Sequence, residues 1–266
     1  MLKKVLTIAG SDTSAGAGMQ ADLKTFQEHD CYGMVALTTI VTMNPSNWNH
    51  QVFPIDTEIL KSQLQTIESI GVDAMKTGML GSVETIEIIA EAIERNNWTK
   101  TVIDPVLVCK GENDVLHPET AEALRTILVP KAFVVTPNLF EASQLAQMKP
   151  LTTIEEMKKA ASKIHALGAK HVVIKGGAKI NYPMAVDLYY DGQEFVLLEN
   201  EKIDTTFTHG AGCTFAASIC ANLANGKSTK EAVELAKKFT ASAIKNGFAL
   251  NEFVGPTRHS AYFNNL

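Results

Sequence analysis

The sequence predicts an α/β protein of three layers, in which helices cover both faces of a mostly parallel β-sheet. Short apolar runs rich in β-branched residues alternate with longer stretches of helical period along the whole chain. Most of these runs are apolar at nearly every position, as strands covered on both faces are. Several runs end in small or polar residues rather than in a hairpin turn, which predicts that polar groups gather at one edge of the sheet.

The strands are expected where the short apolar runs lie. They cover residues 5–10, 34–41, 73–78, 100–108, 132–137, 171–177, 185–192 and 194–199. The last two runs are joined at Asp191-Gly192, which predicts an antiparallel hairpin at the margin of the sheet.

Helical period follows between the strands. Residues 82–97 place isoleucines on one face behind Ser82, a natural N-cap, and residues 154–168 repeat the pattern and end at Gly168. Further on, Ser228 and Glu231 have the spacing of a capping box at the start of another helix.

Composition limits the classes of function. The chain has 266 residues, of which 45% are hydrophobic, and it contains no repeat or linker, so one domain over residues 1–266 is expected. A net charge of −5 without a basic stripe argues against a nucleic-acid partner. Glycine and aspartate interrupt the N-terminal apolar run, which predicts a cytoplasmic protein with no membrane partner. The four cysteines show no CxxC pair and no zinc spacing, and they are expected to be free thiols.

Two glycine-rich segments, residues 11–26 and 208–226, each lead into an expected helix. Glycine lets the backbone approach a ligand, and the N–H groups of a helix start attract anions, so each segment is a candidate phosphate cradle. Gly16, Gly18 and Ala21 also fit the dinucleotide pattern GxGxxA of NAD(P)-dependent oxidoreductases. That class is disfavoured, because residues 11–15 separate the pattern from its strand and no acidic strand end follows about 20 residues later.

Charged residues at strand ends are the next candidates. Asp104 lies inside an apolar run and Lys175 ends another, so each needs a partner. An ion pair would satisfy both, but Gly176 and Gly177 would leave room for phosphate oxygens beside Lys175, which favours a role in ligand binding.

Glu141 follows Asn138 at the spacing of an ordinary helix cap, directly after a strand. Its place at a carboxyl strand end would equally suit a carboxylate that holds Mg²⁺. Both interpretations stay open at this point.

Cys213 follows Gly210, Ala211 and Gly212 at an expected helix start, where the helix dipole favours a thiolate that could act as a base. A lone cysteine is more often inert, as Cys31 and Cys220 are expected to be. His209, beside the same glycines, is at most a supporting residue.

Six blocks occur in order: AGSDTSAGAGMQADLKTF, MKTGML, DPVLVCKG, TPNLFEA, VIKGG and THGAGCT. Together they closely resemble the hydroxymethylpyrimidine kinase and pyridoxal kinase group of the ribokinase-like family, over nearly the whole chain. The resemblance implies a ribokinase-like fold that transfers the γ-phosphate of ATP to the hydroxymethyl group of a small ring. It also implies Mg²⁺ and a homodimer, and it leaves open a need for a monovalent cation.

The resemblance further implies roles for individual residues. Cys213 takes the position of the base, usually an aspartate in the wider family, and Gly210, Ala211 and Gly212 complete an anion hole with it. Glu141 and Asp104 are the expected metal residues. The expected nucleotide contacts are Asn138, Glu141, Lys175, Gly176, Gly177, Asp187, Gly212 and Lys237. The expected substrate contacts are Gly10, Asp12, Met43, Met79 and Cys109.

Departures from the group's pattern concern the substrate. Typical pyrimidine kinases of this group have glutamine where this chain has Met43, and a thioether cannot donate the hydrogen bond that reads the pyrimidine edge. The group also tends to have threonine at the position of Ala211. Cys109 lies in an expected flap, residues 105–118, where a thiol can add to the aldehyde of pyridoxal. The sequence therefore favours pyridoxal, pyridoxine and pyridoxamine, as in vitamin B6 salvage, over hydroxymethylpyrimidine, as in thiamine biosynthesis. A non-catalytic vitamin binder is a further alternative.

Overall fold

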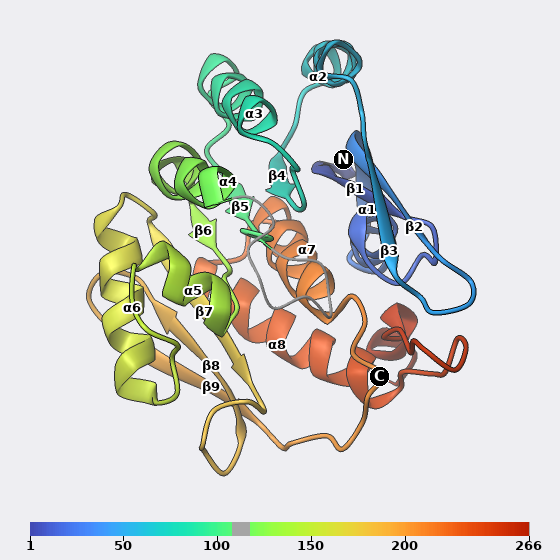
Figure 1. Cartoon of the computed structure of the whole chain (residues 1–266). Coiled ribbons are helices and arrows are strands. Elements are labelled where there is room, and N and C mark those ends of the chain that lie inside the picture. Colours follow the sequence, from blue (N-terminus) through green and yellow to red (C-terminus); the bar gives the residue numbers. More distant parts are fainter. Residues whose placement is uncertain (108–117, 266) are drawn as a thin grey trace.

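The structure, a computed structural model, describes residues 1–107 and 118–265. Within them nine strands form a single sheet in the order β3-β2-β1-β4-β5-β6-β7-β8-β9 (Figure 1). The strands are β1 (Lys3–Asp12), β2 (Cys31–Met43), β3 (His50–Pro54), β4 (Ala74–Thr77), β5 (Thr101–Ile103), β6 (Val134–Val135), β7 (His171–Gly177), β8 (Ala185–Tyr190) and β9 (Phe195–Asn200).

The six central strands, in the order β2-β1-β4-β5-β6-β7, run parallel. Strands β3, β8 and β9 pair antiparallel at the two margins. The carboxyl ends of the parallel strands therefore meet at one edge. The predicted α/β class and the β8–β9 hairpin are confirmed. Two predicted runs form shorter strands: among the described residues, 100–107 contain only β5 and 132–137 contain only β6. Strand β3 was not predicted.

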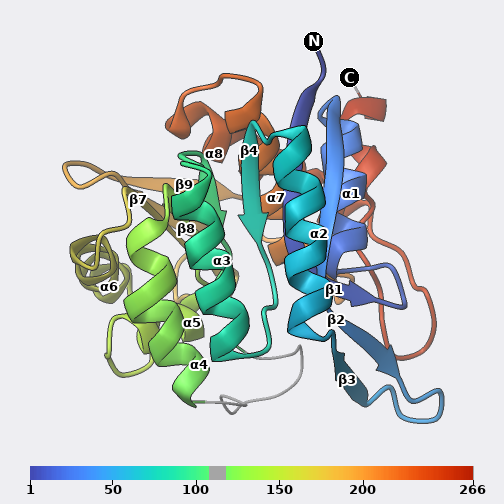
Figure 2. The same ribbon diagram turned by 90° about the horizontal axis from the view of Figure 1, so that it is seen from above.

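The helices form the two outer layers (Figures 1 and 2). They are α1 (Gly18–Glu28), α2 (Thr57–Ile70), α3 (Val83–Arg95), α4 (Pro118–Ala123), α5 (Leu139–Leu145), α6 (Ile154–Ala166), α7 (Ala211–Ala224) and α8 (Thr229–Lys245). A π-helical turn η1 (Leu124–Leu128) and a 3-10 turn η2 (Val129–Lys131) continue α4. Helices α1, α7 and α8 pack together on one face, and α2 to α6 cover the other.

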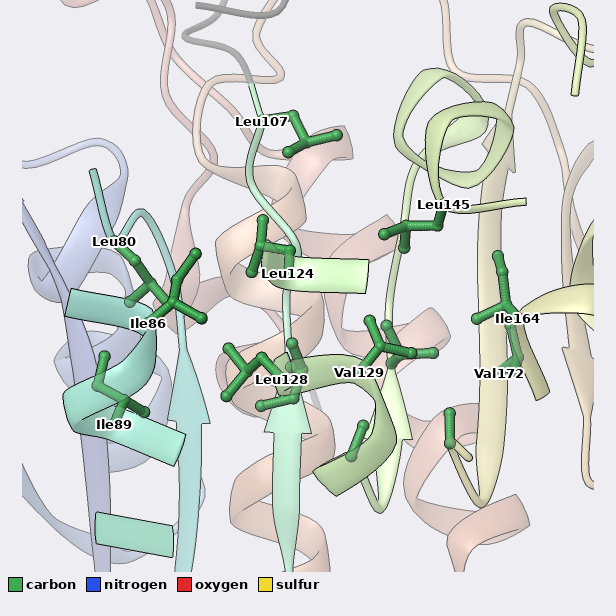
Figure 3. Close-up of a cluster of buried hydrophobic side chains, with 14 of the residues drawn as sticks. Leu80, Ile86, Ile89, Leu107, Leu124, Leu128, Val129, Leu145, Ile164 and Val172 are labelled. Carbon is green, nitrogen blue, oxygen red and sulfur yellow. The ribbon is translucent and has the colours of Figure 1, made fainter. Parts of the chain in front are cut away.

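Neighbouring strand residues divide the core between these two layers. Leu6 and Ile103 belong to the cluster under α2 to α6, whereas Val5 and Val102, one residue earlier in each strand, belong to the cluster under α7 and α8. This alternation is the period of two of a β-strand, and both faces are apolar because both are covered. Figure 3 shows part of the first cluster, where Ile86 of α3 and Leu128 of η1 are labelled.

The predicted helix ends agree with the structure. Ser82 caps α3 by accepting a hydrogen bond from the N–H of Thr85, and Ser228 and Glu231 form the capping box of α8. Gly168, just past α6, has φ of +122°, a conformation that favours glycine. No helix within the described residues is long and apolar enough to cross a membrane.

Candidate active site

The two glycine-rich segments touch each other at the carboxyl edge of the sheet. Gly210 is the N-cap of α7 with φ of +80°, and a Cβ there would lie 1.8 Å from the carbonyl oxygen of Gly16. A side chain at residue 210 would therefore separate the two loops. The two candidate cradles are one structure rather than two separate sites.

Asp12 ties these loops together. Its carboxylate accepts hydrogen bonds from the N–H and hydroxyl of Ser14 and from the N–H of Ala17, and His209 Nε2 lies 2.8 Å from Asp12 Oδ2. Burial opposes ionisation, but the hydrogen bonds from His209 and Ser14 lower the pKa of Asp12 to about 2. A carboxylate has about four acceptor positions, and these partners use them. Asp12 and His209 therefore join the two loops in the structure, and the ring contact of Asp12 stays a prediction.

Lys175 and Asp104 are paired directly. Lys175 Nζ lies 2.7 Å from Asp104 Oδ1, which also accepts a hydrogen bond from Thr136 Oγ1. The sequence favoured a ligand role over an ion pair. The structure shows the ion pair, in which each buried charge is the partner that the other needed, and the ligand role of both residues stays a prediction. Lys175 still faces the anion hole, since a Cβ on Gly212 would lie 3.4 Å from its Nζ.

Glu141 lies beside this pair, and its surroundings are compatible with both roles left open by the sequence, a helix cap and a Mg²⁺ ligand. It forms the capping box of α5 with Asn138, accepting from the N–H of Asn138 at 2.8 Å. Burial raises the pKa of Glu141 to about 7; the charge of Lys175 opposes the rise, and the carboxylate of Asp104 adds to it. The buried carboxylates of Glu141 and Asp104 repel each other. Such a pair suits a divalent cation, which proteins bind through one or two carboxylates together with phosphate oxygens.

The glycines after Lys175 have different neighbours. A Cβ on Gly176 would lie 2.5 Å from the carbonyl oxygen of Val186, so this glycine serves the packing of β7 on β8 rather than opening room for phosphate. Gly177 has φ of +55° and open space on its Cβ side, and its N–H donates to Asp187 Oδ1. Asp187 also pairs with Lys237 of α8 at 2.8 Å. These residues line the β7–β8 side of the edge, where the nucleotide contacts were predicted.

The anion hole has fewer free donors than predicted. The N–H of Ala211 donates to the carbonyl oxygen of Thr208 at 3.1 Å and is therefore occupied. Groups in the first turn of a helix have no intrahelical acceptor, so the N–H groups of Gly212 and Cys213 are the ones offered to an anion.

Cys213, partly exposed in the first turn of α7, is not a ready thiolate. Burial raises the pKa of Cys213 to about 11. The charge of Lys76 and the backbone of Gly18 lower this pKa, and the negative charges of Asp22 and Asp104 raise it further. The sequence pointed to the helix start as favouring a thiolate, and in the structure the effect of burial on the pKa is larger.

Gly10 and Met79 meet at the end of β1. A Cβ on Gly10 would lie 3.3 Å from Met79 Cε and 2.3 Å from Thr39 Oγ1. That hydroxyl is buried and has no hydrogen-bond partner in the part of the chain that the structure describes. Met43 ends β2, farther along the same side. Cys109 and most of the predicted flap lie outside the described residues.

Sequence reasoning missed the most deeply buried charges near the site. Lys76 Nζ lies 2.9 Å from both carboxylate oxygens of Asp22, which also accepts a hydrogen bond from Thr7. The signal was present, because Lys76 ends an apolar run just as Lys175 does. The partner could not be found, because Asp22 lies on a helix 54 positions away in sequence.

The fold and this edge of the sheet define the class of protein, which is a small-molecule kinase with the ribokinase-like fold. Within that class the chain belongs to the phosphomethylpyrimidine kinase family, whose model matches residues 12–258. The family is not one of nicotinamide-dependent oxidoreductases, the class that sequence reasoning had disfavoured.

Three relatives show where the chain lies within the family. It is 60% identical to a pyridoxine kinase of Bacillus subtilis over 262 residues, which cover 98% of this chain and 97% of the relative. A pyridoxal kinase from Staphylococcus aureus, solved in complex with AMP-PCP and pyridoxal, superposes with a TM-score of 0.94 at 57% identity and covers 98% of this chain and 95% of that one. A hydroxymethylpyrimidine/phosphomethylpyrimidine kinase of Bacillus subtilis is 40% identical over 98% of this chain and 96% of its own length.

Proposed function

We propose that this chain transfers the γ-phosphate of ATP to the hydroxymethyl group of pyridoxal, pyridoxine or pyridoxamine. One observation carries the proposal: in the first turn of α7, Gly212 faces Lys175 Nζ directly before Cys213, and Gly210 at the start of the same helix touches the Gly16 loop that follows β1. A phosphate donor and a ring alcohol need this arrangement on the two sides of one proton acceptor. Relatives with the names pyridoxine kinase and pyridoxal kinase support the choice of ring.

The nucleotide belongs on the side of Lys175. When a triphosphate binds, Lys175 would exchange Asp104 for phosphate oxygens, because a free anion in the anion hole competes for the same ammonium group. Asp104 and Glu141 would then hold Mg²⁺, which supplies neutralisation of the charge on the phosphates. Asp187, which is paired with Lys175 in the register of β7 and β8, and its partner Lys237 lie on the same side.

The chemical step needs a proton acceptor at Cys213. The oxygen of the hydroxymethyl group attacks the γ-phosphorus, its proton passes to Cys213 Sγ, and the bond between phosphorus and the β,γ-bridging oxygen breaks, leaving ADP with that electron pair. Cys213 must therefore be a thiolate when the substrate arrives. The Gly212 N–H and Lys175 then stabilise the charge on the phosphoryl group as it moves.

The choice of ring rests on the Met43 side. Met43 offers a polarisable thioether against which a flat ring can pack, but no hydrogen-bond donor. Hydroxymethylpyrimidine is the second candidate substrate, because the 40% identical relative is a hydroxymethylpyrimidine/phosphomethylpyrimidine kinase. The homodimer stays a prediction from the family resemblance, and the cytoplasmic location stays a prediction from the N-terminal sequence.

The test is to incubate the protein with MgATP and, separately, pyridoxal, pyridoxine, pyridoxamine and hydroxymethylpyrimidine, and to follow by mass spectrometry the gain of one phosphate group. We expect product with the three pyridine rings and a kcat/KM at least tenfold lower with hydroxymethylpyrimidine. Cys213→Ala should lose at least about 100-fold in kcat with little change in ATP affinity. Binding of pyridoxal without any phosphorylated product would instead indicate the non-catalytic vitamin binder.

Met43→Gln is the matched test of ring choice. It restores a hydrogen-bond donor and should raise kcat/KM for hydroxymethylpyrimidine relative to pyridoxal. An unchanged ratio of the two would remove Met43 from substrate selection.

A further inference from the structure

A buried pair of charges lies below the proposed proton acceptor and touches none of the reacting groups. Lys76 of β4 and Asp22 of α1 have side chains with 0% exposure, and Lys76 Nζ lies 2.9 Å from each carboxylate oxygen. Thr7 of β1 donates to Asp22 Oδ2 at 2.6 Å. Replacing such a buried pair with apolar side chains often costs a protein little stability, so the pair is weakly explained by folding alone.

The lysine points to the carboxyl edge of the sheet. A Cβ built on Gly78, two residues further along, would lie 3.2 Å from Lys76 Nζ. Helix α7 packs over β4 and against α1, and the first turn of α7 carries Cys213. The ammonium group therefore lies on the strand over which α7 packs, close to the strand's carboxyl end.

Helix α1 also contributes to the surroundings of Cys213 and Lys76. The backbone of Gly18, the first residue of α1, favours the ionised form of Cys213, and Asp22 follows Gly18 by four residues on the same face of the helix. The helix that packs against α7 thus also carries the partner of the lysine.

The charges around Cys213 come from four elements. Lys76 of β4 and Lys175 of β7 favour its ionised form, and Asp22 of α1 and Asp104 after β5 disfavour it. The interaction is mutual, because a thiolate at Cys213 raises the pKa of Lys76 and that of Lys175. Of the two lysines, Lys175 is the one that a bound phosphate would engage. Lys76 has no route to a ligand, since both its position and its partner are buried.

We propose that Lys76 is the fixed counter-charge of the Cys213 thiolate, a positioning residue that acts through Cys213 without contact with either substrate. The thiol proton leaves to solvent before the ring alcohol is seated. The thiolate then accepts the hydroxymethyl proton as the new P–O bond forms, and Asp22 and Thr7 hold the lysine in place throughout. The inference rests on the proposed function only in that Cys213 is the proton acceptor.

The test measures the reactivity of the thiol with no nucleotide or substrate present. In a Cys109→Ser background, Cys213 is alkylated with iodoacetamide at pH 8 to 9.5, and the modified peptide is quantified by mass spectrometry; Cys31 and Cys220 are buried. Lys76→Met should slow alkylation about threefold or more, because a rise of one pKa unit lowers the thiolate fraction tenfold while the remaining thiolate becomes more nucleophilic. Lys61→Met, which removes an exposed lysine of α2, should leave the rate unchanged.

A purely structural role predicts the reverse. A loosened site exposes Cys213 and speeds alkylation, so an equal or faster rate in Lys76→Met would overturn the proposal. Should that variant not fold, the rate is measured in Lys76→Gln, which removes the positive charge but keeps a hydrogen-bond donor beside Asp22, and alkylation at the wild-type rate in this variant would overturn the proposal as well.

Kinase assays give an independent readout. In Lys76→Met the pH profile of kcat should move to higher pH while the KM for MgATP stays the same. If the wild-type protein makes no phosphorylated product, the proposed function fails whatever the alkylation rates are. If product forms but Lys76→Met leaves both the profile and the alkylation rate unchanged, only the role of Lys76 fails.

Discussion

Two lysine–aspartate pairs stand near the same thiol and differ in how they are held. The inner pair, Lys76 and Asp22, has no exposed side-chain surface, and the lysine contacts both carboxylate oxygens. In the outer pair, Lys175 is 17% exposed and contacts a single oxygen of Asp104. The inner pair is fixed by its surroundings, whereas the outer pair faces a rim where another anion can compete.

This difference bears on how the charges around Cys213 are balanced. Each lysine is balanced by its own carboxylate, and burial keeps the Cys213 thiol protonated, with a pKa of about 11. A triphosphate would change only the outer pair. Lys175 would move to a phosphate oxygen, and Asp104 and Glu141 would become available to a cation. We infer that the outer pair responds to the nucleotide and the inner pair supplies a constant field.

The largest expected effect separates the two pairs by stability. Lys76→Met leaves Asp22 buried without its partner and should lower the free energy of unfolding by about 3 to 5 kcal/mol. Lys175 is partly exposed, so Lys175→Met should lower the free energy of unfolding clearly less. Urea unfolding followed by circular dichroism measures both, and equal losses would contradict the distinction between the pairs.

The double variant Lys76→Met/Asp22→Leu is the matched control for that prediction. It removes both charges and replaces them with apolar side chains, so most of the lost stability should return. A double variant as unstable as Lys76→Met would show that the cost comes from packing rather than from an unpaired charge.

The second prediction concerns turnover. Lys175→Met should lower kcat about 100-fold, because it removes a donor aimed at the phosphoryl group. Lys237→Met, which removes the lysine that pairs with Asp187, is the comparison variant and should affect kcat less. Steady-state kinetics with pyridoxal and MgATP decides this, and a Lys175→Met enzyme with normal kcat would restrict the outer pair to a structural role.

The sequence revealed the outer pair more fully than the inner one. Asp104 and Lys175 each interrupt an apolar strand run, which marks a buried charge that needs a partner, and the strand order then brings them together. Asp22 lies in an ordinary amphipathic helix and carries no such mark. Its contact with Lys76 depends on how α1 packs on β1 and β4, which no local pattern encodes.

The smallest predicted effect belongs to a third pair, Asp12 and His209, which joins the two glycine loops. The pKa of Asp12 is lowered to about 2 from 3.8 by its partners, so its stabilisation of the fold is complete above pH 3.8 and is lost as the pH falls towards 2. Asp12→Asn should therefore cost about 2 kcal/mol at pH 7 and almost nothing near pH 2. Urea unfolding at both pH values measures it, and a cost independent of pH would indicate lost packing instead.

Other parts of the fold show where sequence patterns run out. Eight of the nine strands were predicted, because buried strands are apolar at nearly every position. Strand β3 was missed, since it has five residues at the margin of the sheet, four of them exposed, and ends in Pro54. The helix start at Cys213 was found as well, but its pKa was not, because burial depends on the packing of α1 and α7 around the thiol.

A crystal structure with Mg²⁺ and a non-hydrolysable ATP analogue tests the comparison of the two pairs most directly. The account predicts that Lys175 leaves Asp104, from which it now lies 2.7 Å, and contacts a phosphate oxygen, while Lys76 keeps both of its 2.9 Å contacts with Asp22. A bound nucleotide with Lys175 still on Asp104 and no phosphate contact, or with Lys76 displaced from Asp22, would contradict it.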